Sequence, residues 1–233
     1  MGSVSVLIPA YNEEKKIRDT VTAALAVPGV IQVIVVDDGS SDNTLEAAAA
    51  AGAEVKRIFP NKGKGNALNQ GASLIKGDIV VLLDADLGST ALEAEKLVDP
   101  IRKQKTDITV AKIKSSKKSG GFGLVKGLAK HGVKFLTGKE VNCSLSGQRA
   151  MPREVFNELV PFSEGFGVEV GMTVKALSRG FNILEVPVSM KHNETGKDIQ
   201  GFIHRGKQFY HILKVFLQLY IGGGRTCRSS SHC

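Results

Sequence analysis

The chain of 233 residues has 42% hydrophobic and 23% charged side chains, which is enough to bury the core of one α/β domain. Its formal charge of +8 favours anionic partners such as phosphates, nucleotides or acidic membrane surfaces, whereas 6% aromatic residues, no Trp and no nucleic-acid motif argue against nucleic-acid binding. There is no signal peptide, no apolar run of about 18 residues and no zinc spacing among the three cysteines, so we expect a cytoplasmic, reduced protein without a spanning helix.

Strands and helices alternate over the first half of the chain. Aliphatic and β-branched runs predict strands at Val4–Ile8, Ile31–Val36, Ala53–Ile58 and Asp78–Leu83. Helices are expected at Glu13–Ala26, in the Ala-rich run after Asp42, and at Gly65–Ile75. Asn12 and Asp42 are the expected caps of the first two helices. This order predicts an α/β fold with a mostly parallel sheet flanked by helices.

The second half is less regular. It predicts strands at Thr106–Lys112 and Phe181–Val188, a basic loop at Lys112–Gly121, helices at Phe122–Leu136, Val155–Leu159 and Glu169–Arg179, and an apolar-rich end to the segment Gly201–Ile221. Residues 222–233 are small and polar and predict a flexible tail. We therefore expect a single domain over residues 1–221.

Polar, turn-forming residues follow each of the first four predicted strands, in the segments 9–13, 37–40, 61–65 and 84–86. In a parallel sheet the carboxyl ends of the strands share one edge, and ligands bind outside that edge. The four segments therefore predict a single site.

Asp84 and Asp86 follow the fourth strand directly. Hard carboxylate oxygens of this kind suit Mg²⁺ or Mn²⁺, which keep positions open for substrate phosphates. Aspartates after a strand also serve as simple turn residues. The three other polar segments at the same edge favour the metal interpretation.

Lys62 and Lys64 lie among glycines at the start of a predicted helix. Backbone N–H groups, the helix dipole and a lysine together form a cradle for an anion. A solvated glycine-rich turn is the alternative. The neighbouring polar segments favour a phosphate-binding role.

Asp38 and Glu13 each have two interpretations. Asp38 is placed to accept a hydrogen bond from a base N–H, or to stabilise its turn, a role that Asp37 or Asp42 can also take. Glu13 is placed to accept from ribose hydroxyls, or to favour the helix N-terminus by its charge. Both alternatives stay open for each residue.

The runs 8–14, 36–44, 61–68 and 84–86 together resemble family 2 glycosyltransferases with the GT-A fold, a Rossmann-like nucleotide-binding fold. The resemblance implies a nucleotide-sugar-binding half at residues 1–100 and an acceptor-binding half at 101–221. It implies a metal at Asp86, with Asp84 and Ala85 beside the ribose and phosphates and Asp84 close enough to join the metal ligands. It also implies that the nucleotide is held by Pro9, Ala10, Tyr11, Glu13, Asp38 and Lys64.

The second half is similar to the small bacterial glucosyl-3-phosphoglycerate synthase-like enzymes, through Ser144–Ala150 and Gly165–Gly171. This resemblance implies that His192 is a metal ligand. It further implies an acceptor site built from Ser146, Gly147, Gln148, Arg149, His204 and Arg205.

Glu169 and Glu164 are the expected acid/base residues, acting with the metal ligand Asp86, since an inverting transfer needs a carboxylate to take the acceptor proton. A glutamate stabilised by a helix terminus is the alternative for Glu169. The chain lacks a Gln-x-x-Arg-Trp segment, which argues against a processive polysaccharide synthase. It also lacks the Glu-Asp pair of inverting members, which leaves the base and the stereochemical outcome open.

The expected function is metal-dependent transfer of a hexose from a nucleotide sugar, foremost a UDP-sugar, to a phosphorylated acceptor such as a phosphoglycerate-like molecule. The loop Lys112–Gly121 is expected to order over the donor and exclude water. A polyprenyl phosphate is the alternative acceptor, with the basic helices Phe122–Leu136 and Gln208–Ile221 contacting a membrane surface peripherally. A homodimer is a further possible partner arrangement.

Three other classes fit less well. An NAD-dependent dehydrogenase has its glycine fingerprint after the first strand, whereas Gly63 and Gly65 follow the third strand and Leu68 stands at the last glycine position. A nucleotidyltransferase would have a glycine-rich first loop. A non-catalytic nucleotide-binding protein is disfavoured by the intact pair Asp84 and Asp86.

Overall fold

The computed structural model describes residues 2–113, 122–163 and 167–191. The predicted segments Lys112–Gly121 beyond residue 113, Gly201–Ile221 and 222–233 lie outside these ranges, as do Glu164, His192, His204 and Arg205. Strands are β1 (Val4–Ala10), β2 (Val30–Asp37), β3 (Glu54–Arg57), β4 (Ile79–Leu82), β5 (Ile108–Ile113), β6 (Arg149–Pro152) and β7 (Ile183–Val188). Helices are α1 (Glu14–Leu25), α2 (Thr44–Ala50), α3 (Lys64–Ala72), the 3₁₀ helix η1 (Gly88–Ala94), α4 (Glu95–Arg102), α5 (Phe122–Thr137), α6 (Arg153–Leu159) and α7 (Val168–Ser178).

The described strands form one sheet in the order β3-β2-β1-β4-β6-β5-β7. All neighbours pair in parallel except β6, which runs antiparallel to both β4 and β5. The predicted α/β fold with a mostly parallel sheet is therefore confirmed. The expected division at residue 100 falls inside α4, and the sheet continues across it.

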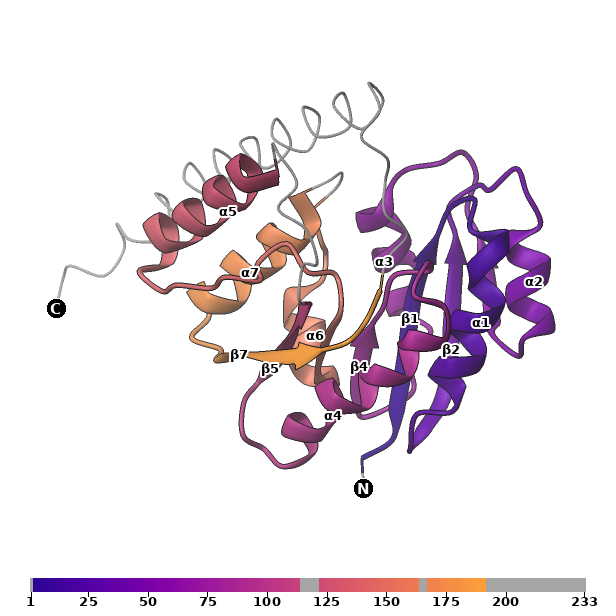
Figure 1. Cartoon of the computed structure of the whole chain (residues 1–233), viewed down its shortest axis with the longest axis horizontal. Coiled ribbons are helices and arrows are strands. Elements are labelled where there is room, and N and C mark those ends of the chain that lie inside the picture. Colours follow the sequence, from indigo (N-terminus) through magenta and orange to yellow (C-terminus); the bar gives the residue numbers. More distant parts are fainter. Residues whose placement is uncertain (1, 114–121, 164–166, 192–233) are drawn as a thin grey trace, which may run out of the picture.

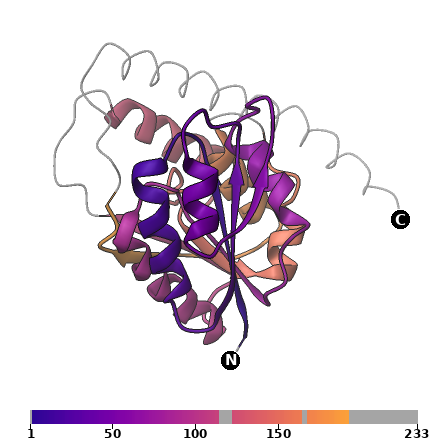
Figure 2. The ribbon, with the colours of Figure 1, turned by 90° about the vertical axis from the view of Figure 1, so that its right-hand side faces the viewer.

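Helices cover both faces of the sheet, because successive strand side chains point to opposite faces. On β1, Val6 and Ile8 pack with α1, α2, η1 and α4, whereas Leu7 packs with α3, α6 and α7 on the other face. Helix α5 packs outside α7 in a third cluster that includes Val133 and Val174. Figure 1 shows this layering, and Figure 2 turns α1 and α2 toward the viewer.

Three local features differ from the sequence predictions. Asn12 is not the N-cap of α1: Glu13 occupies that position and makes no side-chain cap bond. Asn12 has a φ of 54°, and its side chain accepts from the Ser41 N–H at 2.9 Å. Residues 88–102, which the sequence analysis left without an element, form η1 and α4. The segment Ser144–Ala150, for which no strand was predicted, runs into the antiparallel strand β6.

Asp42 was predicted to cap one helix, but its carboxylate accepts hydrogen bonds at the N-termini of both α1 and α2. Its Oδ1 accepts from the Thr44 N–H at 3.1 Å and its Oδ2 from the Glu14 N–H at 3.2 Å. Glu14 in turn accepts from the Asn43 N–H at 3.2 Å. These bonds satisfy N–H groups that have no partner within their own helices, and they fix α1 and α2 to each other beside the site.

Candidate functional site

The four polar segments predicted to meet do lie together at the carboxyl ends of β1, β2 and β4. The Asn12 N–H donates to Ser40 Oγ at 2.9 Å, which joins the first segment to the second. The Lys62 N–H donates to Asp38 Oδ1 at 2.9 Å, which joins the second to the third. Lys64 Nζ donates to Asp84 Oδ1 at 2.6 Å, which joins the third to the fourth. The site is therefore one connected unit.

Asp38 holds the glycine-rich loop in place. Its Oδ1 accepts from Lys62, and its Oδ2 accepts from the Gly63 N–H at 2.6 Å. Its neighbour Asp37 is fully buried and pairs with Arg57 Nε at 2.9 Å, so Asp37 stabilises the turn at the end of β2. The contact of Asp38 with a nucleotide base remains a prediction beside this loop-holding role.

Lys64 is the centre of the charge network. Its ammonium lies 2.6 Å from Asp84 Oδ1 and 2.7 Å from Glu169 Oε1, two carboxylates from different halves of the chain. Burial alone would lower the pKa of Lys64, but the two carboxylates raise that pKa well above its ordinary value. Lys64 is therefore a permanent cation, and its side chain keeps 31% exposure toward the edge of the sheet.

Both carboxylate oxygens of Asp84 accept hydrogen bonds from neighbouring side chains. Its Oδ1 accepts from Lys64, while its Oδ2 accepts from Gln148 Nε2 at 2.5 Å. Ser146 Oγ donates to Gln148 Oε1 at 3.0 Å, so the amide cannot easily turn over. Gln148 is 1% exposed, which makes it a support for Asp84 in this structure. Its contact with an acceptor remains a prediction beside this supporting role.

Gly147 passes directly under the ion pair. A Cβ at this position would lie 2.7 Å from Lys64 Nζ and 2.9 Å from each Asp84 oxygen. Such distances are shorter than van der Waals contact, so the backbone and the charged pair can be this close only because residue 147 has no side chain. The sequence analysis had assigned Gly147 to acceptor binding without this signal.

The region around Asp86 is rich in carboxylates. Burial, followed by the charges of Asp86, Asp42 and Asp84, raises the pKa of Glu13 to about 7. A divalent cation would relieve this repulsion, and oxygen ligands suit Mg²⁺ or Mn²⁺. In the ranges 2–113, 122–163 and 167–191 no three His, Cys, Asp or Glu residues form a metal-binding group. The carboxylates of Asp84 and Asp86 are nevertheless oxygen ligands of the kind that Mg²⁺ or Mn²⁺ accepts, and such an ion keeps positions open for substrate phosphates.

Thr20 orients the turn that carries the two aspartates, a role that the sequence analysis missed. Its hydroxyl donates to the Ala85 carbonyl and accepts from the Gly88 N–H, both at 2.8 Å. Ala85 itself is 5% exposed, so its side chain packs in the core. The turn therefore directs the side chains of Asp84 and Asp86 outward, where both are half-buried.

The predicted nucleotide-binding segment 9–11 lies at the same edge. Ala10 is buried, and its carbonyl accepts from the Asp38 N–H at 2.9 Å. Tyr11 is 51% exposed beside it, and Pro9 lines a small cavity. This arrangement offers an exposed aromatic ring next to the loop that Asp38 holds.

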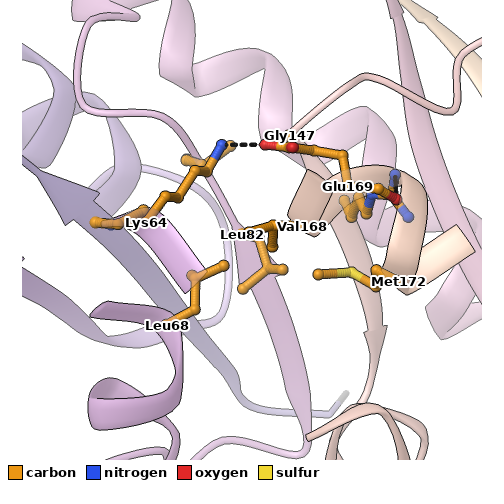
Figure 3. Close-up of a pocket in the computed structure, with 10 residues that line it drawn as sticks. Lys64, Leu68, Leu82, Gly147, Val168, Glu169 and Met172 are labelled. Carbon is orange, nitrogen blue, oxygen red and sulfur yellow. Dashed lines mark hydrogen bonds and ion pairs between the residues drawn. The ribbon is translucent and has the colours of Figure 1, made fainter. Parts of the chain in front are cut away.

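That cavity lies beneath the Lys64–Glu169 pair (Figure 3). Figure 3 shows Lys64 reaching across to Glu169, with the apolar side chains of Leu68, Leu82 and Met172 below them. Arg149 also lines the cavity. Apolar walls around a charged pair lower the local dielectric and strengthen the pairing.

Arg149 is fully buried in this structure. The resemblance implied a place for Arg149 in the acceptor site, but its side chain is 0% exposed and its guanidinium donates to groups within the protein. Its position at the start of β6 explains the difference, because a central strand flanked on both sides by neighbours turns its side chains into the packed interior.

The sequence matches the family described as Glycosyl transferase family 2 over residues 5–160. Glycosyltransferase AglJ of Haloferax volcanii is 30% identical over 84% of this chain and 65% of its own length. Glucosyl-3-phosphoglycerate synthase of Mycolicibacterium smegmatis is 32% identical over 76% of this chain and 65% of its own length. The chain thus spans about 65% of the length of each of these two relatives.

A solved structure shares the fold. Glucosyl-3-phosphoglycerate synthase from Mycobacterium tuberculosis, in complex with Mn²⁺, uridine diphosphate and phosphoglyceric acid, is 28% identical and superposes with a TM-score of 0.77. The match covers 94% of this chain and 78% of that chain. The same enzyme has been crystallised with Mg²⁺ and uridine diphosphate, with a TM-score of 0.76 and 27% identity over 94% of this chain and 79% of that chain.

Proposed function

The chain belongs to glycosyl transferase family 2, and on that premise we propose that it transfers a hexose from a UDP-sugar to a phosphorylated acceptor, with Mg²⁺ or Mn²⁺ at Asp86. The GT-A fold expected from the sequence is confirmed by the superposition on the mycobacterial synthase. One observation carries the proposal: Lys64, Asp84 and Glu169 meet beside Asp86 at the edge where the four polar segments join.

Different segments of the chain would contact different parts of the nucleotide-sugar donor. The segment 9–13 and the loop held by Asp38 form the walls for the nucleoside, and Asp84 with Ala85 lies nearer the ribose and phosphates. The N-terminus of α3 brings the positive end of the helix dipole and the Lys64 cation to the same edge, which favours a diphosphate. A fixed cation that needs no reorganisation stabilises charge on the leaving nucleotide.

Asp86 would hold the metal, with Asp84 as a second ligand and His192 as a third. A bound divalent cation neutralises the charge that develops on the leaving diphosphate. Support for His192 comes from its neighbour: the Lys191 N–H donates to Thr90 Oγ1 at 3.1 Å, which ties this part of the chain to the helix just after Asp86.

Glu169 and Glu164 are the proposed acid/base residues. Glu169 stands in the first turn of α7 with a 15% exposed side chain, so both the catalytic and the helix-terminus interpretations are compatible with its position. Its pairing with Lys64 keeps its carboxylate directed at the donor site. We therefore propose that Glu169 takes the proton from the acceptor hydroxyl or binds the acceptor.

We take a phosphoglycerate-like molecule as the acceptor. Support comes from a relative named glucosyl-3-phosphoglycerate synthase and from a similar structure that holds phosphoglyceric acid. Ser146, Gly147 and Gln148 border the site from the acceptor side, and His204 and Arg205 are proposed to supply the phosphate contacts. The formal charge of +8 agrees with an anionic acceptor.

A polyprenyl phosphate at a membrane surface is the second acceptor class. It is favoured by α5, on which Phe135 is 78% exposed and follows Lys134. However, Lys130 and Lys134 both pair with Glu140, at 2.6 and 3.5 Å, which reduces their pull on an anionic surface. The described helices contain none long and apolar enough to cross a bilayer. Because Glu140 offsets the charges of Lys130 and Lys134, we rank this acceptor second.

The test is a product assay by mass spectrometry. The protein is incubated with UDP-glucose and Mn²⁺, and either 3-phosphoglycerate or vesicles that contain a polyprenyl phosphate. A glucosylated phosphoglycerate supports the proposal, and transfer only to the vesicle lipid supports the second class. Neither product, together with no Mn²⁺-dependent thermal shift by UDP, GDP, CDP, dTDP or ADP, would refute the transferase assignment.

Two further parts of the proposal concern the cellular form. We propose that the protein acts in the cytoplasm, with at most peripheral membrane contact, and that it forms a homodimer. Light scattering on the purified chain gives the mass in solution. A monomer mass at micromolar concentration would contradict the dimer.

A further inference from the structure

We propose that Arg149 is a positioning residue that fixes Glu169 against Lys64, and that it makes no contact with the acceptor. This inference rests on the proposed function, because it concerns the same site. It assigns a role to a buried charge that the transfer mechanism does not otherwise use.

Arg149 ties the loop before β6 to the first turns of α7. Its Nε donates to the Ser146 carbonyl at 3.0 Å. Its Nη2 donates to three oxygens, namely the Ser144 carbonyl at 3.1 Å, the Glu169 carbonyl at 2.9 Å and Thr173 Oγ1 at 3.0 Å. One side chain thus determines how the loop that carries Gly147 sits against the helix that carries Glu169.

The carbonyl of Glu169 is held by two of these groups. It accepts from Arg149 Nη2 at 2.9 Å and from Thr173 Oγ1 at 2.8 Å. Because these two hydrogen bonds fix the Glu169 backbone, they also restrict the position of its carboxylate, which lies 2.7 Å from Lys64 Nζ. A shift of this turn would lengthen the ion pair between Glu169 and Lys64, and the Lys64 ammonium would then pair with Asp84 alone.

The charge of Arg149 acts on Glu169 as well. Burial lowers the pKa of Arg149 to about 10, and the negative charge of Glu169 is the main influence that opposes this. A buried cation without a counter-charge is strongly unfavourable. Glu169 therefore faces two cations, Lys64 in direct contact and Arg149 across the cavity that both residues line.

A direct role in acceptor binding does not fit this geometry. Arg149 is 0% exposed, and Nε and Nη2 are occupied by protein oxygens. Its Nη1 is buried and has no hydrogen-bond partner among residues 2–113, 122–163 and 167–191. The guanidinium therefore acts through Glu169.

The experiment measures kcat and both KM values for Arg149→Lys and Thr173→Val with UDP-glucose, Mn²⁺ and 3-phosphoglycerate, well below each melting temperature. Lysine keeps the charge but cannot make these bonds, so kcat should fall by about 10- to 100-fold. The KM for the acceptor and the binding of UDP with Mn²⁺ should change by less than about threefold. Thr173→Val should lower kcat by about 3- to 10-fold, and Thr173→Ser should recover most of that loss.

Two controls separate positioning from a structural effect. Thr22→Val removes a comparable hydroxyl bond, from Thr22 Oγ1 to the Arg18 carbonyl at 2.9 Å, on a helix surface away from the site. Its kcat should match that of the wild type. In an E169Q background Arg149→Lys should have almost no additional effect on kcat, because the two residues act as one unit.

Three outcomes would overturn the inference while leaving the proposed function intact. They are a wild-type kcat in folded Arg149→Lys, a large rise of the acceptor KM with kcat unchanged, or losses that simply multiply in the double variant. An inactive wild-type protein would instead refute the proposed function. If Arg149→Lys does not fold, the kcat values of Thr173→Val and Thr173→Ser test the same inference.

Discussion

Replacing Gly147 by alanine should disturb the charge network and leave the fold intact. The new Cβ would lie 2.7 Å from Lys64 Nζ and 2.9 Å from both Asp84 oxygens. All three atoms are the ends of side chains, which can retreat, whereas the backbone around residue 147 need not move. The 2.6 Å contact between Lys64 and Asp84 would therefore open.

The size of the effect follows from the geometry. Opening the contact from 2.6 Å to about 3.3 Å, at an effective dielectric constant of about 20, weakens the attraction by about 1.4 kcal/mol. If the network is needed only in the transition state, kcat falls about tenfold. We would measure kcat with UDP-glucose and 3-phosphoglycerate, and the binding of UDP with Mn²⁺ by calorimetry.

A matched substitution is available in α5. A Cβ on Gly127 would meet nothing within 4 Å. Gly127→Ala should therefore stabilise the protein by about 0.4–1 kcal/mol and leave kcat unchanged. The reasoning would be refuted if Gly147→Ala kept full activity, or if it lowered the melting temperature by many degrees, because a steric effect confined to side-chain ends predicts neither.

The remaining predictions concern the metal, the pH dependence and the packing of α3. Asp86→Ala should abolish Mn²⁺-dependent binding of UDP without lowering the melting temperature, which calorimetry and thermal unfolding check together; unchanged metal-dependent binding would rule out this ligand. The pKa of Glu13 is raised from 4.5 to about 7, so the folded state holds the proton more tightly than the unfolded state. This contribution to stability is present below about pH 4.5 and is lost as the pH rises to about 7. In urea titrations without metal, the free energy of unfolding of the wild type should fall relative to that of Glu13→Gln as the pH rises from about 4.5 to about 7. Saturating Mn²⁺ should reduce this difference. Free energies of unfolding that change in parallel with pH in the two proteins would contradict the raised pKa of Glu13. Gly65→Ala should destabilise the whole domain by about 1–3 kcal/mol or more, because its Cβ would collide with the backbone oxygen of Ser163. An unchanged melting temperature would show that this loop yields.

The elements of the first half could be predicted because their signals are local. The run from Ile31 to Val36 is almost all β-branched, and it forms most of β2. Helix α3 begins at Lys64, directly after Gly63, whose φ of 88° suits glycine. Aliphatic runs, turn residues and caps act within a few positions, so the sequence alone carries them.

Elements without a local signal were missed. Strand β6 has four residues, and it forms because β4 and β5 lie on either side of it. Helix α4 contains Pro100, which weakens its helical pattern, although Leu97, Val98 and Ile101 are spaced to face the core. Both elements depend on neighbours that a single sequence does not show.

The sequence by itself determined the α/β fold, the family and the edge of the sheet at which the polar residues gather. The tertiary structure decided which charges pair there. Lys64 and Glu169 are 105 positions apart, yet their side chains are in contact. Arg149, which the resemblance placed in the acceptor site, is fully buried. Residue types and spacing specify which groups arrive at the edge, but the partner of each charged atom depends on distances through space that exist only once the sheet and its two layers of helices have packed.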